Sequence, residues 1–171
     1  LGTLPFGDHV QVNVLTPVWR ERGGQPVAWD LKKDSYSTNG NSVMLRLDYG
    51  QCRILLTADL NTASQAEILD AYEGRLHEFA CDVAKSCHHG SDDVDLRFLR
   101  AMQPAITVIS SGDNETHDHP RPGIVGASGV TGFVTTSADG TKLLTPLIYM
   151  TEISRSSKFD HLVEITGEDE G

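Results

Sequence analysis

Asp59 and two clusters of histidines are the residues of this sequence that are best suited to chemistry. Asp59 follows an apolar run, His88 and His89 follow a second one, and His117 and His119 lie in a polar stretch farther along the chain. Carboxylate oxygens and imidazole nitrogens bind catalytic divalent metals, and strand ends hold such ligands rigidly. The pattern predicts part of a metal-dependent hydrolytic site, in a sequence that offers fewer ligands than a complete site needs.

Alternating and apolar runs predict the strands that would position these residues. Two of them flank residues 49–51 in the pattern of a β-hairpin, and Val43, Leu45 and Leu47 are expected to face the core. The second arm is apolar on both faces and is expected deep in a sheet. Residues 16–40 show no period and are expected to form a long loop. The predicted strands are residues 9–15, 42–48, 52–57, 82–87 and 105–110.

Apolar residues at helical spacing predict helices between these strands. Thr62 and Gln65 resemble a capping box for a helix that ends near Gly74. Ser91 or Asp92 is expected to cap the next helix. The succession of hairpin, helix, strand, helix and strand predicts an α/β (α+β) fold with helices covering a mixed sheet. A weaker helix and a hairpin turn are expected at residues 124–130 and 138–140.

The length and charge limit the classes of function. A chain of 171 residues suits a single domain over residues 1–171 or the C-terminal portion of one. Its formal net charge of −10 disfavours loose electrostatic binding to nucleic acid or anionic lipid. Bound divalent cations would offset this charge locally, so a phosphate-bearing substrate stays compatible with it. No apolar run reaches the ~20 residues of a membrane-spanning helix.

Cysteine usage and the two ends of the chain give further expectations. Cys52, Cys81 and Cys87 are odd in number and two of them fall in expected strands, which favours buried free thiols in a reducing, cytoplasm-like compartment. Cys87, beside two histidines, is a weaker candidate metal ligand. The chain starts at Leu1 rather than Met, which favours an excised segment of a longer protein, and the acidic residues 167–171 are expected to fray.

Six short segments occur in an order and spacing that point to one protein family. They are residues 38–42, 55–59, 82–85, 88–91, 108–112 and 119–120. Together they resemble the later half of a metallo-β-lactamase-fold hydrolase, most closely the branch with the extracytoplasmic hydrolase domain of ComEC-type DNA-uptake proteins. The resemblance covers roughly residues 10–120. It implies a four-layer αββα sandwich, of which this chain holds the later half, with a two-metal site at one edge.

The resemblance also implies roles for individual residues. Asp59 matches the family's metal-bridging carboxylate, although Ala58 stands where the family usually has Gly. His88 or His89 matches the histidine of the HHGS motif, and His119 matches the late histidine. Two divalent ions, zinc or manganese, would share these ligands and activate water for attack on a phosphoryl or acyl group. Asp59 and His88 are the implied catalytic residues.

The family's earlier HxHxDH motif, which supplies most of the metal ligands, has no counterpart in this sequence. Two functional hypotheses follow: the later portion of a metal-dependent phosphodiesterase or nuclease, or a non-catalytic binding or scaffolding module on the same fold. In both cases the inner face of the sheet would be exposed. The N-terminal half of the same protein, or self-association, is therefore expected to cover it.

Each candidate also has a purely structural interpretation. A strand-end aspartate such as Asp59 commonly caps a helix. One of His88 and His89 is expected to be solvated, because adjacent side chains on an extended segment point in opposite directions. Ser91 is expected to be a helix cap first and a contact to substrate phosphate second. The remaining polar residues, interpreted as turn formers or exposed side chains, are Asn39, Asn41, His9, His77, His117 and His161.

Overall fold

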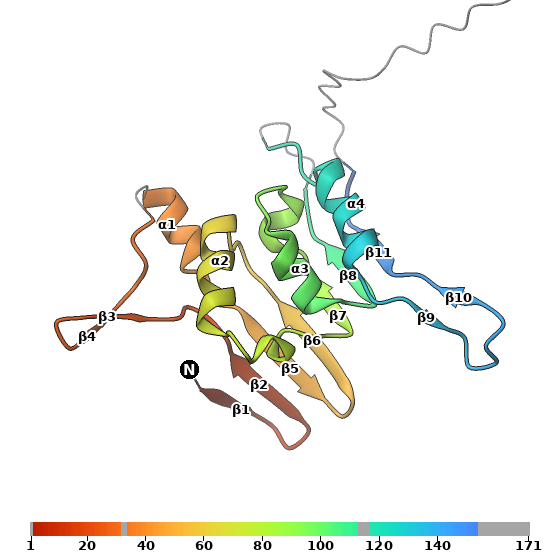
Figure 1. Cartoon of the computed structure of the whole chain (residues 1–171), viewed down its shortest axis with the longest axis horizontal. Helices are drawn as coiled ribbons and strands as arrows, with labels where there is room; N and C mark the ends of the chain where they lie inside the picture. The colour runs from red at the N-terminus through yellow and green to blue at the C-terminus, as the bar shows by residue number, and fades with distance from the viewer. Residues whose placement is uncertain (1, 32–33, 113–116, 154–171) are drawn as a thin grey trace, which may run out of the picture.

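One seven-stranded mixed sheet organises the chain (Figure 1). The computed structural model describes residues 2–31, 34–112 and 117–153. The strands follow the spatial order β1-β2-β5-β6-β7-β8-β11, with antiparallel pairing from β1 to β6 and parallel pairing from β6 to β11. They are β1 (Thr3–Phe6), β2 (Val10–Val14), β5 (Leu45–Tyr49), β6 (Cys52–Leu56), β7 (Val83–Lys85), β8 (Ile106–Ile109) and β11 (Leu147–Met150).

Helices α2, α3 and α4 cover one face of this sheet (Figure 1). Their apolar side chains form one buried core with Leu55 of β6 and Ala84 of β7. Each helix leads from one strand to its parallel neighbour, which is the kind of connection that parallel pairing requires. The predicted α/β (α+β) class is confirmed. The helices are α1 (Asp34–Gly40), α2 (Thr62–Ala71), α3 (Leu96–Met102) and α4 (Pro122–Thr131), with the short turns η1 (Leu76–Glu78) and η2 (Cys87–Gly90).

Parallel pairing places the ends of three strands side by side. Leu56 of β6 is in register with Lys85 of β7, which is in register with Val108 of β8. The loops that follow these residues therefore leave the sheet along one line, the carboxyl edge. Asp59 follows β6, η2 follows β7, and the loop toward α4 follows β8. The topology thus brings the candidate site residues to the same edge.

Residues 16–40 are more ordered than the predicted loop. They contain a hairpin, β3 (Arg20–Arg22) and β4 (Gln25–Val27), and helix α1. Gly23 and Gly24 both adopt positive φ, as a tight hairpin turn requires. The hairpin strands are short and largely exposed, so they lack the alternation that indicates a half-buried strand. Helix α1 has seven residues, too few for a helical period to show in the sequence.

The predicted hairpin of β5 and β6 is confirmed, and the apolar face of its first arm is turned away from the helices, as expected of a face that another layer covers. Met44 is fully buried, whereas Val43 is half exposed. Leu45 and Leu47 lie on the sheet face opposite to that of Leu55, which points toward the helices. The alternation of Leu45 and Leu47 with charged residues marks an apolar face but does not by itself reveal whether the helices or another layer cover it.

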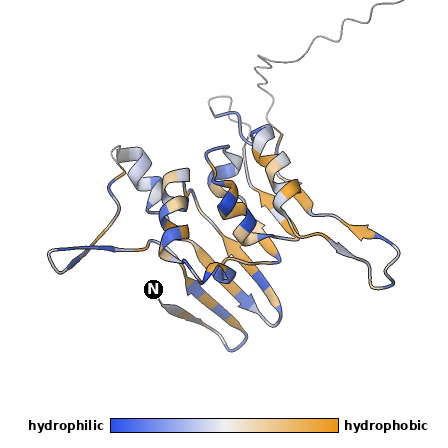
Figure 2. Cartoon of the chain, viewed as in Figure 1, coloured by the Kyte–Doolittle hydropathy of each residue, from blue (hydrophilic) through white to orange (hydrophobic). Residues whose placement is uncertain are grey.

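The sheet face opposite to the helices, the open face, is apolar and partly exposed. Figure 2 shows the apolar character of the central strands. Half-exposed large side chains occur on this face from its first strand to its last, and an apolar surface of this kind usually marks a contact with another protein, a ligand or a membrane. These side chains are Leu4, Phe6, Tyr49, Leu56, Leu147 and Tyr149, with exposed fractions between 37% and 66%.

The helix caps differ from the predicted ones. Asn61, with Ser64 three residues later, forms the capping box of α2, and Asp95 caps α3. The predicted capping box that starts at Thr62 and the predicted cap at residues 91–92 are therefore wrong. Serine, threonine, asparagine and aspartate all cap helices, and several of them precede each helix, so the sequence alone does not select the one that does.

The elements near the C-terminus match the prediction. Helix α4 is the predicted weaker helix, and β9 (Thr135–Thr136) pairs with β10 (Leu143–Leu144) around the predicted turn. The predicted frayed residues 167–171, and His161, lie outside the described residues. No helix in the described part of the chain is long and apolar enough to cross a bilayer.

Candidate functional site

Three loops meet at the carboxyl edge, and each carries candidate residues. Strand β6 ends shortly before Asp59, and β7 ends shortly before His88 and His89. Strand β8 leads into the loop that contains His117 and His119. The structure thus brings all of the predicted metal-binding residues to one end of the sheet.

Two backbone hydrogen bonds hold these loops together. The N–H of His88 donates to the carbonyl oxygen of Ala58 at 2.9 Å, and the N–H of Arg121 donates to the carbonyl oxygen of Gly90 at 2.8 Å. A Cβ at position 90 would lie 2.7 Å from the Cβ of Pro120, which is closer than carbon atoms approach. The glycine of the HHGS segment therefore allows the second loop to pack against the third.

Asp59 and His89 face each other across the first two loops. Nε2 of His89 lies 3.6 Å from Oδ1 of Asp59, and both side chains are partly exposed. Nδ1 of His89 lies 2.8 Å from the carbonyl oxygen of Ser110, which can only accept, so Nδ1 carries a proton. In the neutral ring the lone pair is then on Nε2, directed at the carboxylate. Proteins commonly orient a metal-binding histidine through a backbone carbonyl in this way.

The distance between Asp59 and His89 fits a shared metal ion. Two ligand atoms bound to one tetrahedral zinc ion lie about 3.4 Å apart, given zinc–ligand bonds of ~2.1 Å. The observed 3.6 Å is close to that value. Asp59 is also available for this role, because Asn61 and not Asp59 is the N-cap of α2. The structural interpretation of Asp59 as a helix cap is therefore wrong.

Left-handed backbone is concentrated at this edge. Among the described non-glycine residues, five have positive φ, and four of these are Ala58, His88, His89 and Asp118, with φ between 45° and 54°. Such φ values cost L residues roughly 1–2 kcal/mol each and persist mostly at functional sites. Turn η2 is thus left-handed rather than extended. The expected extended segment is therefore wrong, although one of the two histidines, His89, is exposed as expected.

The rings of His88, His117 and His119 form a second group at the carboxyl edge. Ring centroids are 5.8 Å apart for His88 and His119, and 6.0 Å apart for His117 and His119. In the described part of the chain, Nδ1 of His88, Nδ1 of His119 and Oδ1 of Asp118 are buried and lack a hydrogen-bond partner. Burial, and to a lesser extent the nearby charge of Arg121, lowers the pKa of His119. The His119 ring is therefore neutral at neutral pH and keeps a lone pair.

These donors fit part of a metal site. The Asp59–His89 pair and the unpartnered imidazole nitrogens are donors of the type that zinc accepts, and carboxylates also suit manganese. Among the residues that the structure describes, however, no three His, Cys, Asp or Glu side chains form a group that could hold an ion. A catalytic zinc site needs three protein ligands. The described residues therefore provide an incomplete ligand set.

Ser91 and Cys87, the lesser candidates, are both largely inaccessible. Oγ of Ser91 accepts a hydrogen bond from the N–H of Asp93 at 3.1 Å, and Ser91 is 8% exposed. A contact of Ser91 with substrate phosphate stays a prediction, although Ser91 does not lie at the N-terminus of α3, where such a contact was expected. Burial raises the pKa of the Cys87 thiol to about 11. A protonated thiol is a poor metal ligand, so the structure disfavours Cys87 in that role.

Three residues of the carboxyl edge were not identified from the sequence. The side chain of Asn39 contacts His88, the carbonyl group of Ser110 orients His89, and Asp118 has a buried carboxylate oxygen. The sequence predicts a turn former at Asn39, because asparagine next to glycine is typical of turns. Asn39 lies within residues 38–42, one of the segments that resemble the family, and this position could have indicated a role at the site. A backbone carbonyl carries no signal of its own in the sequence.

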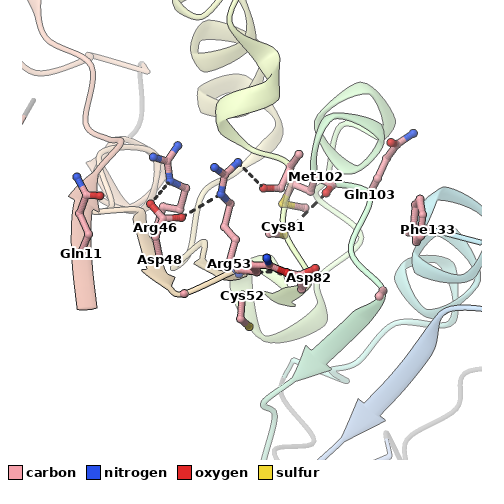
Figure 3. A pocket seen from close by; sticks show the side chains of 14 residues that line it. Gln11, Arg46, Asp48, Cys52, Arg53, Cys81, Asp82, Met102, Gln103 and Phe133 are labelled. Atoms are coloured by element: carbon pink, nitrogen blue, oxygen red, sulfur yellow. Dashed lines mark hydrogen bonds and ion pairs between the residues drawn. The ribbon is translucent and has the colours of Figure 1, made fainter. Parts of the chain in front are cut away.

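A pocket of about 830 Å³ lies at the opposite end of the sheet (Figure 3). Hydrogen bonds pair the charged residues in its wall with one another. The carboxylate of Asp48 accepts hydrogen bonds from Nε of Arg46 at 3.1 Å and from Nε of Arg53 at 3.0 Å. Oδ2 of Asp82 accepts from the backbone N–H of Arg53 at 2.7 Å. The candidate residues do not line this pocket. It therefore adds nothing to the site at the carboxyl edge.

Comparison with known proteins finds partial similarity to two competence proteins. Over 88 residues the chain is 31% identical to ComE operon protein 3 of Bacillus subtilis (strain 168). Over 90 residues it is 32% identical to Competence protein ComA of Neisseria gonorrhoeae. The matches cover 51% and 52% of this chain but only 11% and 13% of the two relatives. No family model and no solved structure matches the chain. The predicted similarity to ComEC-type competence proteins is thus confirmed over about half of the chain.

Proposed function

We propose that this chain is the later portion of a metal-dependent hydrolase domain in a ComEC-like protein, and that it acts on a phosphodiester. The observation that carries the proposal is the convergence of Asp59, His89 and His119 on the carboxyl edge of three neighbouring strands. Ligand sites of α/β sheets lie at the carboxyl ends of strands. Partial similarity to two competence proteins supports the same branch of proteins.

Asp59 and His89 are the proposed ligands of one divalent ion, zinc or manganese. Their donor atoms lie 3.6 Å apart, and the carbonyl group of Ser110 holds the His89 ring in the orientation that directs Nε2 at Asp59. His119 forms no three-ligand group with this pair in the described residues, so it is proposed as a ligand of the second ion of a two-metal site, because its ring has a nitrogen without a partner. A bound divalent ion supplies a water molecule of lowered pKa and offsets charge on a phosphoryl oxygen.

Charge gives a reason for cations at this edge. The chain has a formal net charge of −10, and Asp59 adds negative charge to the site itself. Arg121, with Nη1 3.6 Å from Oδ2 of Asp118, offsets the charge of Asp118. An anionic phosphodiester would be repelled by this arrangement unless bound cations reversed the local charge. The proposed substrate class and the proposed metal therefore depend on each other.

The missing ligands and the cover of the open face are proposed to come from the N-terminal half of the same protein, with self-association as the alternative. Leu147 and Tyr149 are 49% and 57% exposed on the last strand of that face, and Phe6 is 66% exposed on the first. At ~25 cal/mol per Å², several hundred Å² of apolar surface left in water is a cost of many kcal/mol. One additional sheet layer would cover the face and could also bring ligands to its edge.

Metal titration of the full-length protein tests the ligand assignment. Calorimetric titration with Zn²⁺ or Mn²⁺ should show binding that His89→Ala weakens about tenfold or more. His77→Ala is the matched control, because His77 lies in η1, whose backbone bonds to Arg53 at the opposite end of the sheet. An equal effect of both substitutions, or no binding by the wild type, would refute the assignment.

A non-catalytic binding or scaffolding module is the second candidate function. It is favoured by the absence, within the described residues, of any group of three ligands that could hold an ion. Under this alternative the full-length protein would lack metal-dependent hydrolysis, and substitution of Asp59 would leave its binding functions unchanged. Hydrolysis by the full-length protein therefore separates the two candidates.

A further inference from the structure

Asn39 lies in the last turn of α1, and contacts on both sides fix that turn. Oδ1 of Asn41 accepts from the N–H of Trp29 at 3.0 Å, and its Nδ2 donates to the carbonyl oxygen of Trp29 at 2.8 Å. Nδ2 of Asn61, which is 1% exposed, donates to the carbonyl oxygen of Tyr36 at 2.7 Å. The amide of Asn39 therefore has a defined position relative to the loop that contains Asp59.

This amide meets the ring of His88. Nδ2 of Asn39 lies 3.5 Å from Nε2 of His88. The other ring nitrogen, Nδ1, is buried and has no hydrogen-bond partner in the described part of the chain. An amide nitrogen donates and does not accept, so Nε2 must present its lone pair to it. In the neutral ring the proton is then on Nδ1.

We infer that Asn39 is a positioning residue that holds neutral His88 in the Nδ1–H form and thereby separates the roles of the two adjacent histidines. The lone pair of His88 is directed at the Asn39 amide. The lone pair of His89 is directed at Asp59, because the carbonyl group of Ser110 accepts the proton on the opposite nitrogen. A metal ion binds a lone pair, so His89 rather than His88 is the ligand beside Asp59. This ligand assignment rests on the proposed function, whereas the tautomer of His88 does not.

The strained backbone of η2 is what allows the two neighbouring rings to have different partners. His88 (φ 45°, ψ 50°) and His89 (φ 54°, ψ 24°) are successive left-handed residues. Two such residues cost more than an ordinary turn, and strain of this kind persists where the surroundings fix it. Here the Asn39 contact and the Ser110 contact each fix one ring.

Long-range ¹⁵N–¹H NMR of the metal-free full-length protein in alkaline buffer tests the tautomer, because it distinguishes a protonated ring nitrogen from an unprotonated one. Wild-type His88 is expected to carry its proton on Nδ1. Asn39→Asp should move the proton to Nε2, since the carboxylate has the same shape as the amide but only accepts. Asn39→Ala should also shift His88 toward the Nε2–H form that solvated imidazoles favour. His9 and His77 are internal references whose signals should stay unchanged.

An Nε2–H form of His88 in the wild type would overturn the inference, and so would a tautomer that neither substitution changes. Zn²⁺ added to the same wild-type sample then tests the ligand assignment. Perturbation of the His89 signals, with the His88 tautomer retained, would support it, whereas direct binding at His88 would contradict it. If the full-length protein shows the expected tautomer but binds no metal, the proposed function fails while the role of Asn39 stands.

Discussion

Replacement of Ala58 by glycine should stabilise the fold. Ala58 has φ 50° in the loop that carries Asp59. A left-handed conformation costs an L residue roughly 1–2 kcal/mol, whereas glycine adopts it freely. Glycine also makes the unfolded chain more flexible, which offsets about 0.4–1 kcal/mol of this stabilisation. The net expectation for Ala58→Gly is a gain of about 0.5–1 kcal/mol in the free energy of unfolding.

Urea unfolding at one fixed protein concentration measures this change, since the stability of an associating chain depends on concentration. Ala66→Gly is the matched control, because it makes the same chemical change within α2. There it should lower the free energy of unfolding by about 1 kcal/mol. Opposite signs for the two substitutions would support the reasoning. A loss at position 58 as large as that at position 66 would refute it.

Three further perturbations probe other parts of the molecule. In the full-length protein, His119→Ala should release more metal than His117→Ala, because His119 is partly buried and His117 is exposed. Mass spectrometry after dialysis measures the metal content, and equal losses would contradict the choice of His119. Light scattering of the isolated chain should show self-association through the open face, and a monodisperse monomer of 18.6 kDa that unfolds cooperatively would show that the face needs no cover. Asp95→Ala should cost about 1 kcal/mol at neutral pH, because Asp95 caps α3. A hydrogen bond from Arg97 lowers the pKa of Asp95. The stabilisation by Asp95 is therefore present above its unfolded-state pKa and should vanish as the pH falls through its folded-state pKa. A stability difference between the wild type and Asp95→Ala that does not depend on pH would contradict this explanation.

The parts of the fold with a strong local pattern were predictable from the sequence. The hairpin of β5 and β6 was indicated by two apolar runs around Gly50, which indeed has positive φ. Helix α1 was missed because seven residues show no period, and its position depends on tertiary contacts through Asn41 and Asn61. The burial of Met44 rather than Val43 was also not predictable, since an alternating pattern marks an apolar face but does not say which layer covers it.

The candidate site was predictable in composition but not in geometry. Parallel strands that end before Asp59 and before the two histidines of η2 were enough to predict that these residues meet at one edge. The left-handed turn at His88 and His89 was not predictable, because no glycine marks these positions. The contacts of the two rings also come from distant segments, Asn39 in α1 and the Ser110 carbonyl group after β8.

Hydrolysis by the full-length protein tests the central claim most directly. Asp59→Asn removes the charge of the proposed metal-binding carboxylate and keeps its shape, whereas Asp70→Asn makes the same change at an exposed position of α2. With Mn²⁺ or Zn²⁺ and bis-p-nitrophenyl phosphate, Asp59→Asn should lower the rate on the order of 100-fold or more, and Asp70→Asn should leave it unchanged. Activity of Asp59→Asn within a few fold of the wild type, or no metal-dependent hydrolysis by the wild type, would contradict the account.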